Sequence, residues 1–260
     1  MDVVIGAGTT PGKTDPLLEY AGVERKALIS IAGQPMIKWV TDALAGSPHV
    51  DRLIIVGLDE SSGIDVGPKP VIYLPQRGRL IENYIAGVER ALQDTHDRQH
   101  ILIAGCDIPL ITTAIVDDHV EAMLKTDYDV YYSIVGRATM LAKFPTSGRS
   151  YTHLRDGVFC SGALHMISSA VMDSNTRQLW NDLLERRKNV FQQAALAGYG
   201  TLFRLITRTL TIAAAEKRAE EILGVRCKAI VSRHAEIGMD VDKPFQLDIA
   251  RQELEQRARS

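Results

Sequence analysis

Short aliphatic runs alternate with longer amphipathic segments along the first half of the chain. The runs carry few polar residues, and they lie at Val3–Ile5, Leu53–Val56, Val71–Leu74, Ile101–Ala104 and Val130–Val135. Apolar positions at helical spacing fill most of the gaps, at about 35–46, 81–94 and 113–125. Strands without polar alternation are typical of sheets that helices cover on both faces. The pattern therefore predicts a three-layer α/β/α, Rossmann-like domain with a mixed, mainly parallel sheet.

The second half of the chain has a different pattern. Helical periodicity dominates from about 174 to 223, which we interpret as a helical insertion. Two further strands and a charged helix are predicted afterwards, at Cys227–Val231, at about Ala235–Met239 and from Pro244 onward. Because no low-complexity linker and no internal repeat divides the sequence, we expect residues 1–260 to form a single domain.

A glycine-rich segment follows the first strand directly, as in a phosphate-binding turn. Gly6 and Gly8 begin the dinucleotide fingerprint G-x-G-x-x-G, but Pro11 stands where the third glycine belongs. Ala7–Thr14 also fits a loosened P-loop pattern, A-x-x-x-x-G-K-T. The segment is therefore open to more than one interpretation, and the residues that follow it decide between them.

A P-loop must pass directly into a helix whose N-terminus holds the phosphates. Here Pro16 follows closely and Gly22 closes the segment, so any helix between them is short. The third interpretation is one long phosphate-binding loop that ends at Lys26. Ala27–Ile37 continues it with a strand-like run, a Gly-x-Pro-Met sequence and the start of a helix.

This succession of strand, glycine-rich loop, lysine and Gly-x-Pro-Met resembles the N-terminal signature of the MobA-like NTP transferases. These nucleotidyltransferases are related to molybdenum-cofactor guanylyltransferase and to sugar-phosphate and methylerythritol-phosphate nucleotidyltransferases. The resemblance continues, in the family's order and at roughly its spacing, at Leu53–Gly57, Ile101–Leu110 and Met239–Leu247. It implies a GT-A-type nucleotide-diphospho-sugar transferase fold. It also implies Mg²⁺-dependent transfer of a nucleoside monophosphate from a nucleoside triphosphate to a small phosphorylated acceptor, with release of pyrophosphate.

Two aspartate positions are candidates for a metal site, because Mg²⁺ prefers a few carboxylates and takes other ligands from substrate phosphates. Asp107 follows a strand-like run, and Pro109 fixes the turn behind it; the resemblance makes it the metal aspartate, and the alternative is a turn-forming role. Asp240 and Asp242 alternate and would share a face, so spacing does not choose between them. The resemblance selects Asp242 as the second ligand, although an aspartate before a proline is also an ordinary helix cap.

Lys26 and Lys13 are the cations expected to meet a triphosphate, and exposed surface lysines are the alternative interpretation. The resemblance favours Lys26 and implies that it acts in catalysis with Asp107. It also assigns base recognition to the segment around Gln76 and an acceptor-side position to Ser161-Gly162, a small pair that is equally typical of packing. The expected nucleotide-binding residues are Gly6, Ala7, Gly8, Lys13, Lys26, Gln76 and Gly78.

Composition narrows the choice of partners and compartment. The 260 residues carry a net charge of −2, which argues against a nucleic-acid surface or a polybasic membrane patch. Cys106, Cys160 and Cys227 lie far apart, so neither a zinc site nor a disulfide framework is indicated. No apolar run reaches the roughly 18 residues of a membrane span, and we expect a cytoplasmic protein. The oligomeric state stays open.

Two other function classes remain alongside a nucleotidyltransferase. A P-loop kinase or NTPase would use Lys13 and Thr14 for the nucleotide and Asp107 as the Walker B carboxylate. A non-catalytic nucleotide-binding module is the other, because the family usually carries an arginine after its glycines, where this chain has Thr10–Gly12. Hydrolase chemistry has little support, since the histidines form no metal motif and Ser161 lacks a nucleophile elbow.

Overall fold

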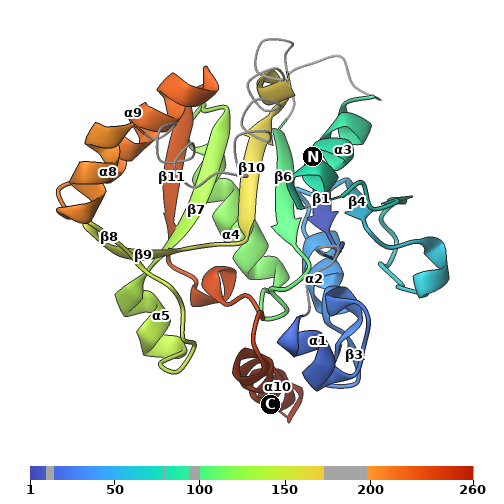
Figure 1. The fold of residues 1–260 in the computed structure, drawn as a ribbon. Coiled ribbons are helices and arrows are strands. Elements are labelled where there is room, and N and C mark those ends of the chain that lie inside the picture. Colours follow the sequence, from blue (N-terminus) through green and yellow to red (C-terminus); the bar gives the residue numbers. More distant parts are fainter. Residues whose placement is uncertain (10–14, 79, 94–99, 173–197, 260) are drawn as a thin grey trace.

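The computed structural model describes residues 1–9, 15–78, 80–93, 100–172 and 198–259. Within these residues the main sheet has nine strands, in the order β5-β4-β1-β6-β10-β7-β9-β8, and β11 pairs with β7 (Figure 1). The strands are β1 (Asp2–Gly6), β4 (Arg52–Val56), β5 (Val71–Leu74), β6 (His100–Gly105), β7 (Val130–Gly136), β8 (Thr152–Leu154), β9 (Gly157–Ser161), β10 (Leu164–Ser168) and β11 (Cys227–Ser232). A separate two-stranded hairpin joins β2 (Ser30–Ile31) to β3 (Gln34–Pro35).

The sheet is mixed and mainly parallel, as predicted. β5, β4, β1 and β6 pair in parallel, and so do β7 and β11. β10 lies between β6 and β7 and is antiparallel to both, so those two strands run in the same direction. The carboxyl ends of β1, β6 and β7 therefore meet at one edge of the sheet, where ligands bind in folds of this type.

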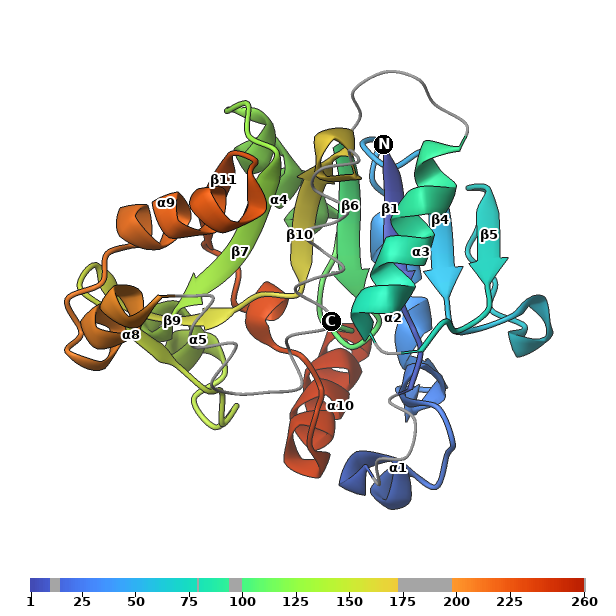
Figure 2. The ribbon, with the colours of Figure 1, turned by 45° about the horizontal axis from the view of Figure 1, so that its top comes forward.

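Helices cover both faces of the sheet. Figure 2 shows α3 (Leu80–Leu92) in front of β1 and β4, with α2 (Met36–Ala45) and α4 (Thr113–Leu124) on the other face. Figure 1 shows α1 (Pro16–Ala21) and α10 (Pro244–Arg259) below the edge where β6 ends. The predicted three-layer α/β/α architecture is thus confirmed.

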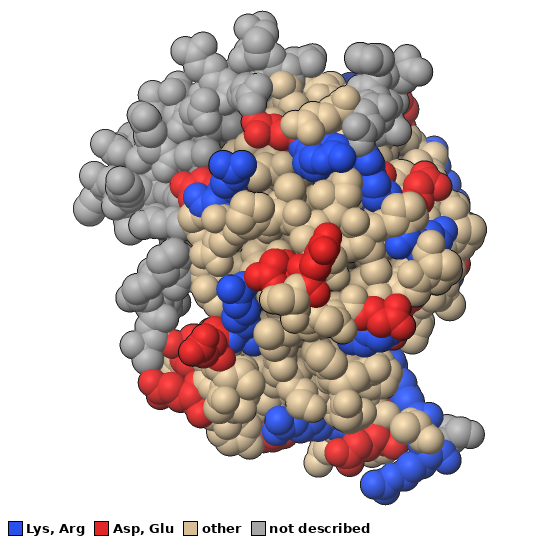
Figure 3. Space-filling model, turned by 90° about the vertical axis from the view of Figure 1, so that its right-hand side faces the viewer, with Lys and Arg blue, Asp and Glu red and all other residues tan. Residues whose placement is uncertain are grey.

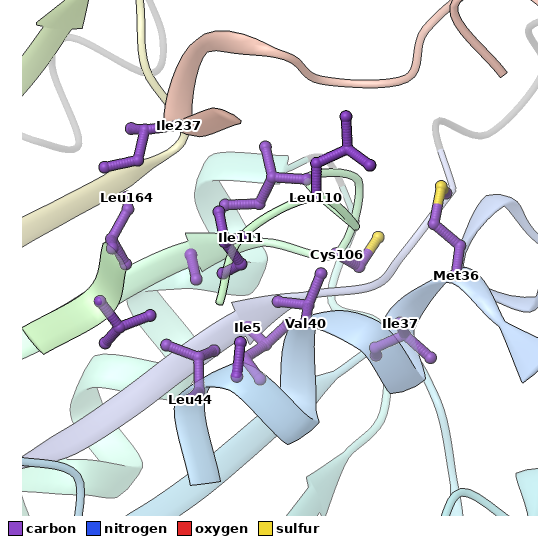
Figure 4. Packing of buried hydrophobic residues seen from close by; sticks show 14 of the residues in the cluster. Ile5, Met36, Ile37, Val40, Leu44, Cys106, Leu110, Ile111, Leu164 and Ile237 are labelled. Atoms are coloured by element: carbon purple, nitrogen blue, oxygen red, sulfur yellow. The ribbon is translucent and has the colours of Figure 1, made fainter. Parts of the chain in front are cut away.

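Continuous aliphatic strands are needed because each strand faces two apolar layers. In β1, Val3 and Ile5 are fully buried in the cluster that includes α2 and α4, whereas Val4 is fully buried in the cluster beneath α3. In Figure 4, Val40 and Leu44 of α2 point toward Ile5. Each fully buried side chain of this size contributes about 1.5–3 kcal/mol to folding.

The chain after β10 contains helices where they were predicted, as far as it is described. α8 (Tyr199–Ile206) and α9 (Ile212–Leu223) precede β11, and residues 173–197 lie outside the described part. α9 also covers the edge of β11: the amides of Cys227 and Ala229 donate to Glu220 (3.1 Å) and Glu216 (2.9 Å). These carboxylates occupy backbone donors that would otherwise be free to pair with another strand.

The strand predicted at about Ala235–Met239 is wrong. The segment is a 3₁₀ helix, η4 (Ala235–Gly238), closed by a bond from the Met239 amide to the Glu236 carbonyl (3.1 Å). The alternation of polar and apolar residues misled the prediction, because it implied that the polar positions face solvent. Glu236 stands at a polar position but is buried, and it pairs with Lys143 of α5 (Arg137–Lys143) at 2.5 Å. The ion pair of a buried carboxylate with a distant element is invisible to local periodicity.

The surface fits the balanced composition. On the face seen in Figure 3, Lys and Arg side chains are interspersed with Asp and Glu. Within the described residues, every helix is too short or too polar to span a bilayer.

We predict that acid destabilises this fold partly through His119, which is buried on α4 with its Nε2 2.7 Å from the Ser133 hydroxyl. Burial lowers the pKa of His119 from 6.5 to about 4. The unfolded chain therefore binds one more proton between these pH values, and stability falls as the pH drops through them, by up to about 1.4 kcal/mol per pH unit. Urea unfolding of His119→Gln at pH 5, 6 and 7 should show a shallower loss than wild type. Parallel pH curves for the two proteins would contradict this.

Candidate functional site

A pocket of about 480 Å³ opens at the carboxyl ends of β1 and β6. Its walls come from the glycine-rich loop, α1, α3, the loop after β6, β10 and the segment before α10. The lining residues are Gly6, Gly8, Thr9, Asp15, Leu18, Lys26, Leu80, Asn83, Tyr84, Gly105, Cys106, Asp107, Gly162, Ala163, His165, Asp240 and Asp242. The sheet edge at which the sequence predicted a ligand site therefore carries a cavity.

Lys26 joins the two predicted metal aspartates. Its Nζ lies 2.6 Å from Asp107 Oδ2 and also forms an ion pair with Asp242 Oδ1. Lys26 is the first residue of a 3₁₀ turn, η1 (Lys26–Leu28), and its side chain is only 17% exposed. Burial works against its charged form, but the two carboxylates outweigh burial and raise the pKa of Lys26 above its usual value. The same ammonium lowers the pKa of Asp242 against the effect of burial.

Asp240 adds a third carboxylate to the pocket and has its own cation. It forms an ion pair with Arg149, whose Nη2 also donates to the Ser161 carbonyl at 3.3 Å. Burial, and then the charge of Asp107, raise the pKa of Asp240 to about 6. The negative charges of Asp107 and Asp242 thus both disfavour the ionised form of Asp240.

The donor set suits a hard divalent cation. All three carboxylates offer oxygen ligands, and the repulsion that raises the pKa of Asp240 is a cost that a bound cation would relieve. Within the described ranges, no three His, Cys, Asp or Glu side chains are close enough together to hold a metal ion by themselves. Mg²⁺ is a cation of this kind that commonly takes one or two carboxylates and completes its shell with water and substrate phosphates.

The glycine-rich loop approaches its neighbours too closely for side chains. A Cβ on Gly8 would lie 2.6 Å from Asn83 Nδ2, and one on Gly57 would lie 2.4 Å from the Gly8 nitrogen. Gly57 also has a φ of +106°, which favours glycine. The loop is thus held between α3 and the turn after β4, with its backbone facing the pocket.

Gln76 fastens this loop in place. Its Nε2 donates to the carbonyls of Thr9 (2.6 Å) and Gly78 (3.0 Å), and its Oε1 accepts from the Thr9 amide (3.0 Å). Gln76 could therefore contact the edge of a nucleotide base only by giving up some of these hydrogen bonds. The Ala7 amide is likewise engaged, with the Val56 carbonyl at 2.8 Å.

The structure brings together five of the predicted site residues in one pocket: Gly6, Gly8, Lys26, Asp107 and Asp242. Gln76 and Ala7 lie next to the pocket through the contacts above, and Gly78 accepts from Gln76. Lys13 lies outside the described residues. The individual roles of all these residues stay predictions.

The helix after the loop differs from that of a P-loop. α1 begins with Pro16, is six residues long and ends at Gly22. Its N-cap is Asp15, whose carboxylate accepts from the Leu17 amide at 2.9 Å. A protein carboxylate thus occupies the helix N-terminus at which a P-loop would bind phosphate, and its charge opposes an anion there.

Sequence reasoning missed several pocket residues. On α3, Leu80, Asn83 and Tyr84 have the i, i+3, i+4 spacing of one helix face, a signal that was available. Tyr84 donates to the Ala104 carbonyl at 3.2 Å, and burial, reinforced by Asp107, raises the pKa of its hydroxyl. His165 had no local signal, because only the sheet order carries it to the pocket, and Arg149 reaches the site only through its ion pair with Asp240.

Comparisons with known proteins agree with this geometry. The chain is similar to a hypothetical transferase from Thermus thermophilus, with 32% identity over 95% of this chain and 98% of that one, at a TM-score of 0.78. The fold also matches 4-diphosphocytidyl-2C-methyl-D-erythritol synthase from Anaerococcus prevotii, with 13% identity, 98% and 95% coverage and a TM-score of 0.60. A CMP:2-keto-3-deoxy-manno-octonic acid synthetase complexed with CTP matches with 13% identity, 99% and 100% coverage and a TM-score of 0.58.

No curated protein sequence gives a significant match. The model of the MobA-like NTP transferase domain matches residues 20–198, well over half of the chain. With the pocket and the fold, this match confirms the resemblance seen in the sequence: the chain belongs to the MobA-like NTP transferase family.

Proposed function

We propose that this protein is a Mg²⁺-dependent nucleotidyltransferase that moves a nucleoside monophosphate from a nucleoside triphosphate to a small phosphorylated acceptor and releases pyrophosphate. The observation that carries the proposal is the contact of Lys26 with both Asp107 and Asp242 beside the glycine-rich loop. Membership of a nucleotidyltransferase family supports it. So does the CTP complex of the synthetase with the same fold.

The reaction places negative charge on both sides of the α-phosphorus. An acceptor oxygen forms a new bond to that phosphorus, and the bond to the bridging oxygen breaks, so its electron pair leaves with pyrophosphate. Lys26 would exchange its carboxylate partners for phosphate oxygens and offset this charge. The glycine-rich loop would let the triphosphate approach the backbone closely.

Asp107 and Asp242 would hold the metal ion. When bound, Mg²⁺ supplies positive charge that offsets the charge of the phosphates and helps to orient them. Asp240 would stay paired with Arg149 behind this site. We also infer a cytoplasmic location, since the three cysteines are free thiols buried in the fold, as suits a reducing compartment.

The products of the reaction test the proposal directly. We expect acceptor-dependent pyrophosphate when the protein is incubated with each common nucleoside triphosphate, Mg²⁺ and a mixture of sugar 1-phosphates, polyol phosphates and molybdopterin-like acceptors. Chromatography with ³¹P NMR would resolve the products. Nucleoside diphosphate as the sole product would instead indicate a kinase or NTPase. Tight nucleotide binding without turnover of any acceptor would favour a non-catalytic module.

Replacement of Asp107 tests the metal site. Asp107→Asn keeps the size of the side chain but removes the charge that pairs with a cation, so Mg²⁺ should no longer strengthen nucleotide binding. Turnover should fall by on the order of 100-fold or more. Titration calorimetry with and without Mg²⁺ measures the first effect, and Asp248→Asn, on the exposed surface of α10, is the matched control. A folded Asp107→Asn protein with unchanged metal-dependent binding would remove Asp107 from the site.

Replacement of the lysines distinguishes the long phosphate-binding loop that ends at Lys26 from the P-loop alternative that uses Lys13. Lys26→Met should reduce turnover by on the order of 100-fold, because the charge opposite the phosphates is lost. Lys13→Met should have a smaller effect, and Lys38→Met, which breaks a surface pair with Asp42, should have none. Steady-state kinetics on proteins shown to be folded by circular dichroism gives the ranking. If Lys13→Met abolishes nucleotide binding while Lys26→Met behaves like wild type, the P-loop alternative replaces this proposal.

A further inference from the structure

His165 of β10 lines the pocket, and its hydrogen bonding defines which ring nitrogen carries the proton. The amide of Ser133 donates to His165 Nδ1 at 3.1 Å. Since a backbone N–H can only donate, Nδ1 must be the acceptor nitrogen, and the proton of the neutral ring is on Nε2. The imidazole lines the pocket together with Gly162 and Ala163. Among the described residues, the Nε2 group has no hydrogen-bond partner that accounts for its proton.

The imidazole accepts the hydrogen bond from the Ser133 amide because the pairing of β10 with β7 ends before Ser133. β10 pairs with β7 through Met166 opposite Tyr131 and Ile167 opposite Val130, and the ladder then stops. At Ser133 the backbone carbonyl accepts instead from the Gly162 amide at 2.9 Å. The imidazole of His165 thus replaces the missing carbonyl as the acceptor for the Ser133 amide.

A second contact fixes the plane of the ring. His165 stacks on Tyr132, with 4.7 Å between the centroids and 8° between the planes. The Ser161 hydroxyl donates to the Gly162 carbonyl (2.9 Å), so the Tyr132 hydroxyl must donate to Ser161 (2.6 Å). Tyr132 is therefore anchored in turn, and the donor of His165 points in a direction that is set before any ligand binds.

The ring is neutral at physiological pH. Burial lowers the pKa of His165 to about 4. Its Nδ1 is already in use, so the group can donate one hydrogen bond but cannot serve as a base. This suits a phosphate nucleophile, because a phosphate monoester is ionised near pH 7 and attacks without losing a proton to the protein.

The position of β10 selects the acceptor rather than the nucleotide as the ligand. In the sheet order β5-β4-β1-β6-β10, the glycine-rich loop follows β1 and Asp107 follows β6. A nucleotide that reaches from the loop to Asp107 leaves the side of β10 for the molecule that attacks it. We propose that His165 binds the acceptor by donating its Nε2–H to an oxygen of the acceptor phosphate monoester. This inference rests on the proposed function.

Side-chain substitutions separate this role from a structural one. His165→Asn keeps an oxygen near the position of Nδ1 for the Ser133 amide but has no donor at the position of Nε2, whereas His165→Gln can restore a donor there. A hydrogen bond to a charged group corresponds to about a 10- to 100-fold change in affinity. The acceptor KM of His165→Asn should rise by that factor, with the Kd of the Mg²⁺–nucleotide complex unchanged and partial recovery in His165→Gln. His153→Asn, on β8, is the matched control.

An unchanged acceptor KM in His165→Asn would overturn the proposal, as would an equal loss of nucleotide affinity. A second readout does not depend on turnover. In ¹⁵N-histidine NMR the free protein should show His165 as the Nε2–H tautomer, and glycerol 3-phosphate added with Mg²⁺ and a non-hydrolysable nucleotide should shift that resonance. If no acceptor yields pyrophosphate, the proposed function fails while such a shift still supports this site. No shift at saturating glycerol 3-phosphate would overturn it.

Discussion

The paired contact of Lys26 with Asp107 and Asp242 is the interaction on which the pocket depends. It joins residues 81 and 216 positions apart in the chain and so connects the end of the glycine-rich loop, the turn after β6 and the segment before α10. A largely buried ammonium is tolerated only because carboxylates surround it. Each of the three segments therefore fixes the position of the others, and the loss of Lys26 would leave both carboxylates without this cation.

Periodicity was sufficient for most of the fold. The strands β1, β4, β5 and β6 carry mostly aliphatic residues because they face apolar layers on both sides, and that requirement is visible in the sequence. Periodicity failed at Ala235–Met239, where a segment with the alternating pattern of a strand forms a 3₁₀ turn. There two long-range contacts hold the backbone: the ion pair of the buried Glu236 with Lys143, and a hydrogen bond from the Ala163 amide to the Ile237 carbonyl (2.9 Å). Both partners are distant in sequence, so no local pattern reports them.

The candidate site was predictable to the extent that its residues follow strands. Asp107 follows β6 directly, and a parallel sheet gathers such strand ends at one edge. Lys26 lies in η1, before the separate β2–β3 hairpin, and was anticipated from the glycine-rich loop and the family resemblance. Gln76 shows the limit of this reasoning: its position was anticipated, but its amide is engaged with the backbone of Thr9 and Gly78. His165 reaches the pocket only because β10 is inserted antiparallel between β6 and β7, a feature of topology that the sequence does not state.

The charges around the pocket explain why neutral donors and a metal ion belong in the same site. Among its described lining residues, Asp15, Asp107, Asp240 and Asp242 are acidic and Lys26 is basic, with Arg149 behind Asp240. A triphosphate would meet net repulsion in such a site, and a divalent cation between the carboxylates and the phosphates turns repulsion into attraction. A second cationic side chain close to the metal ion would repel it. A donor without charge, such as the Nε2–H of His165, can orient an anionic acceptor beside the metal without competing with it.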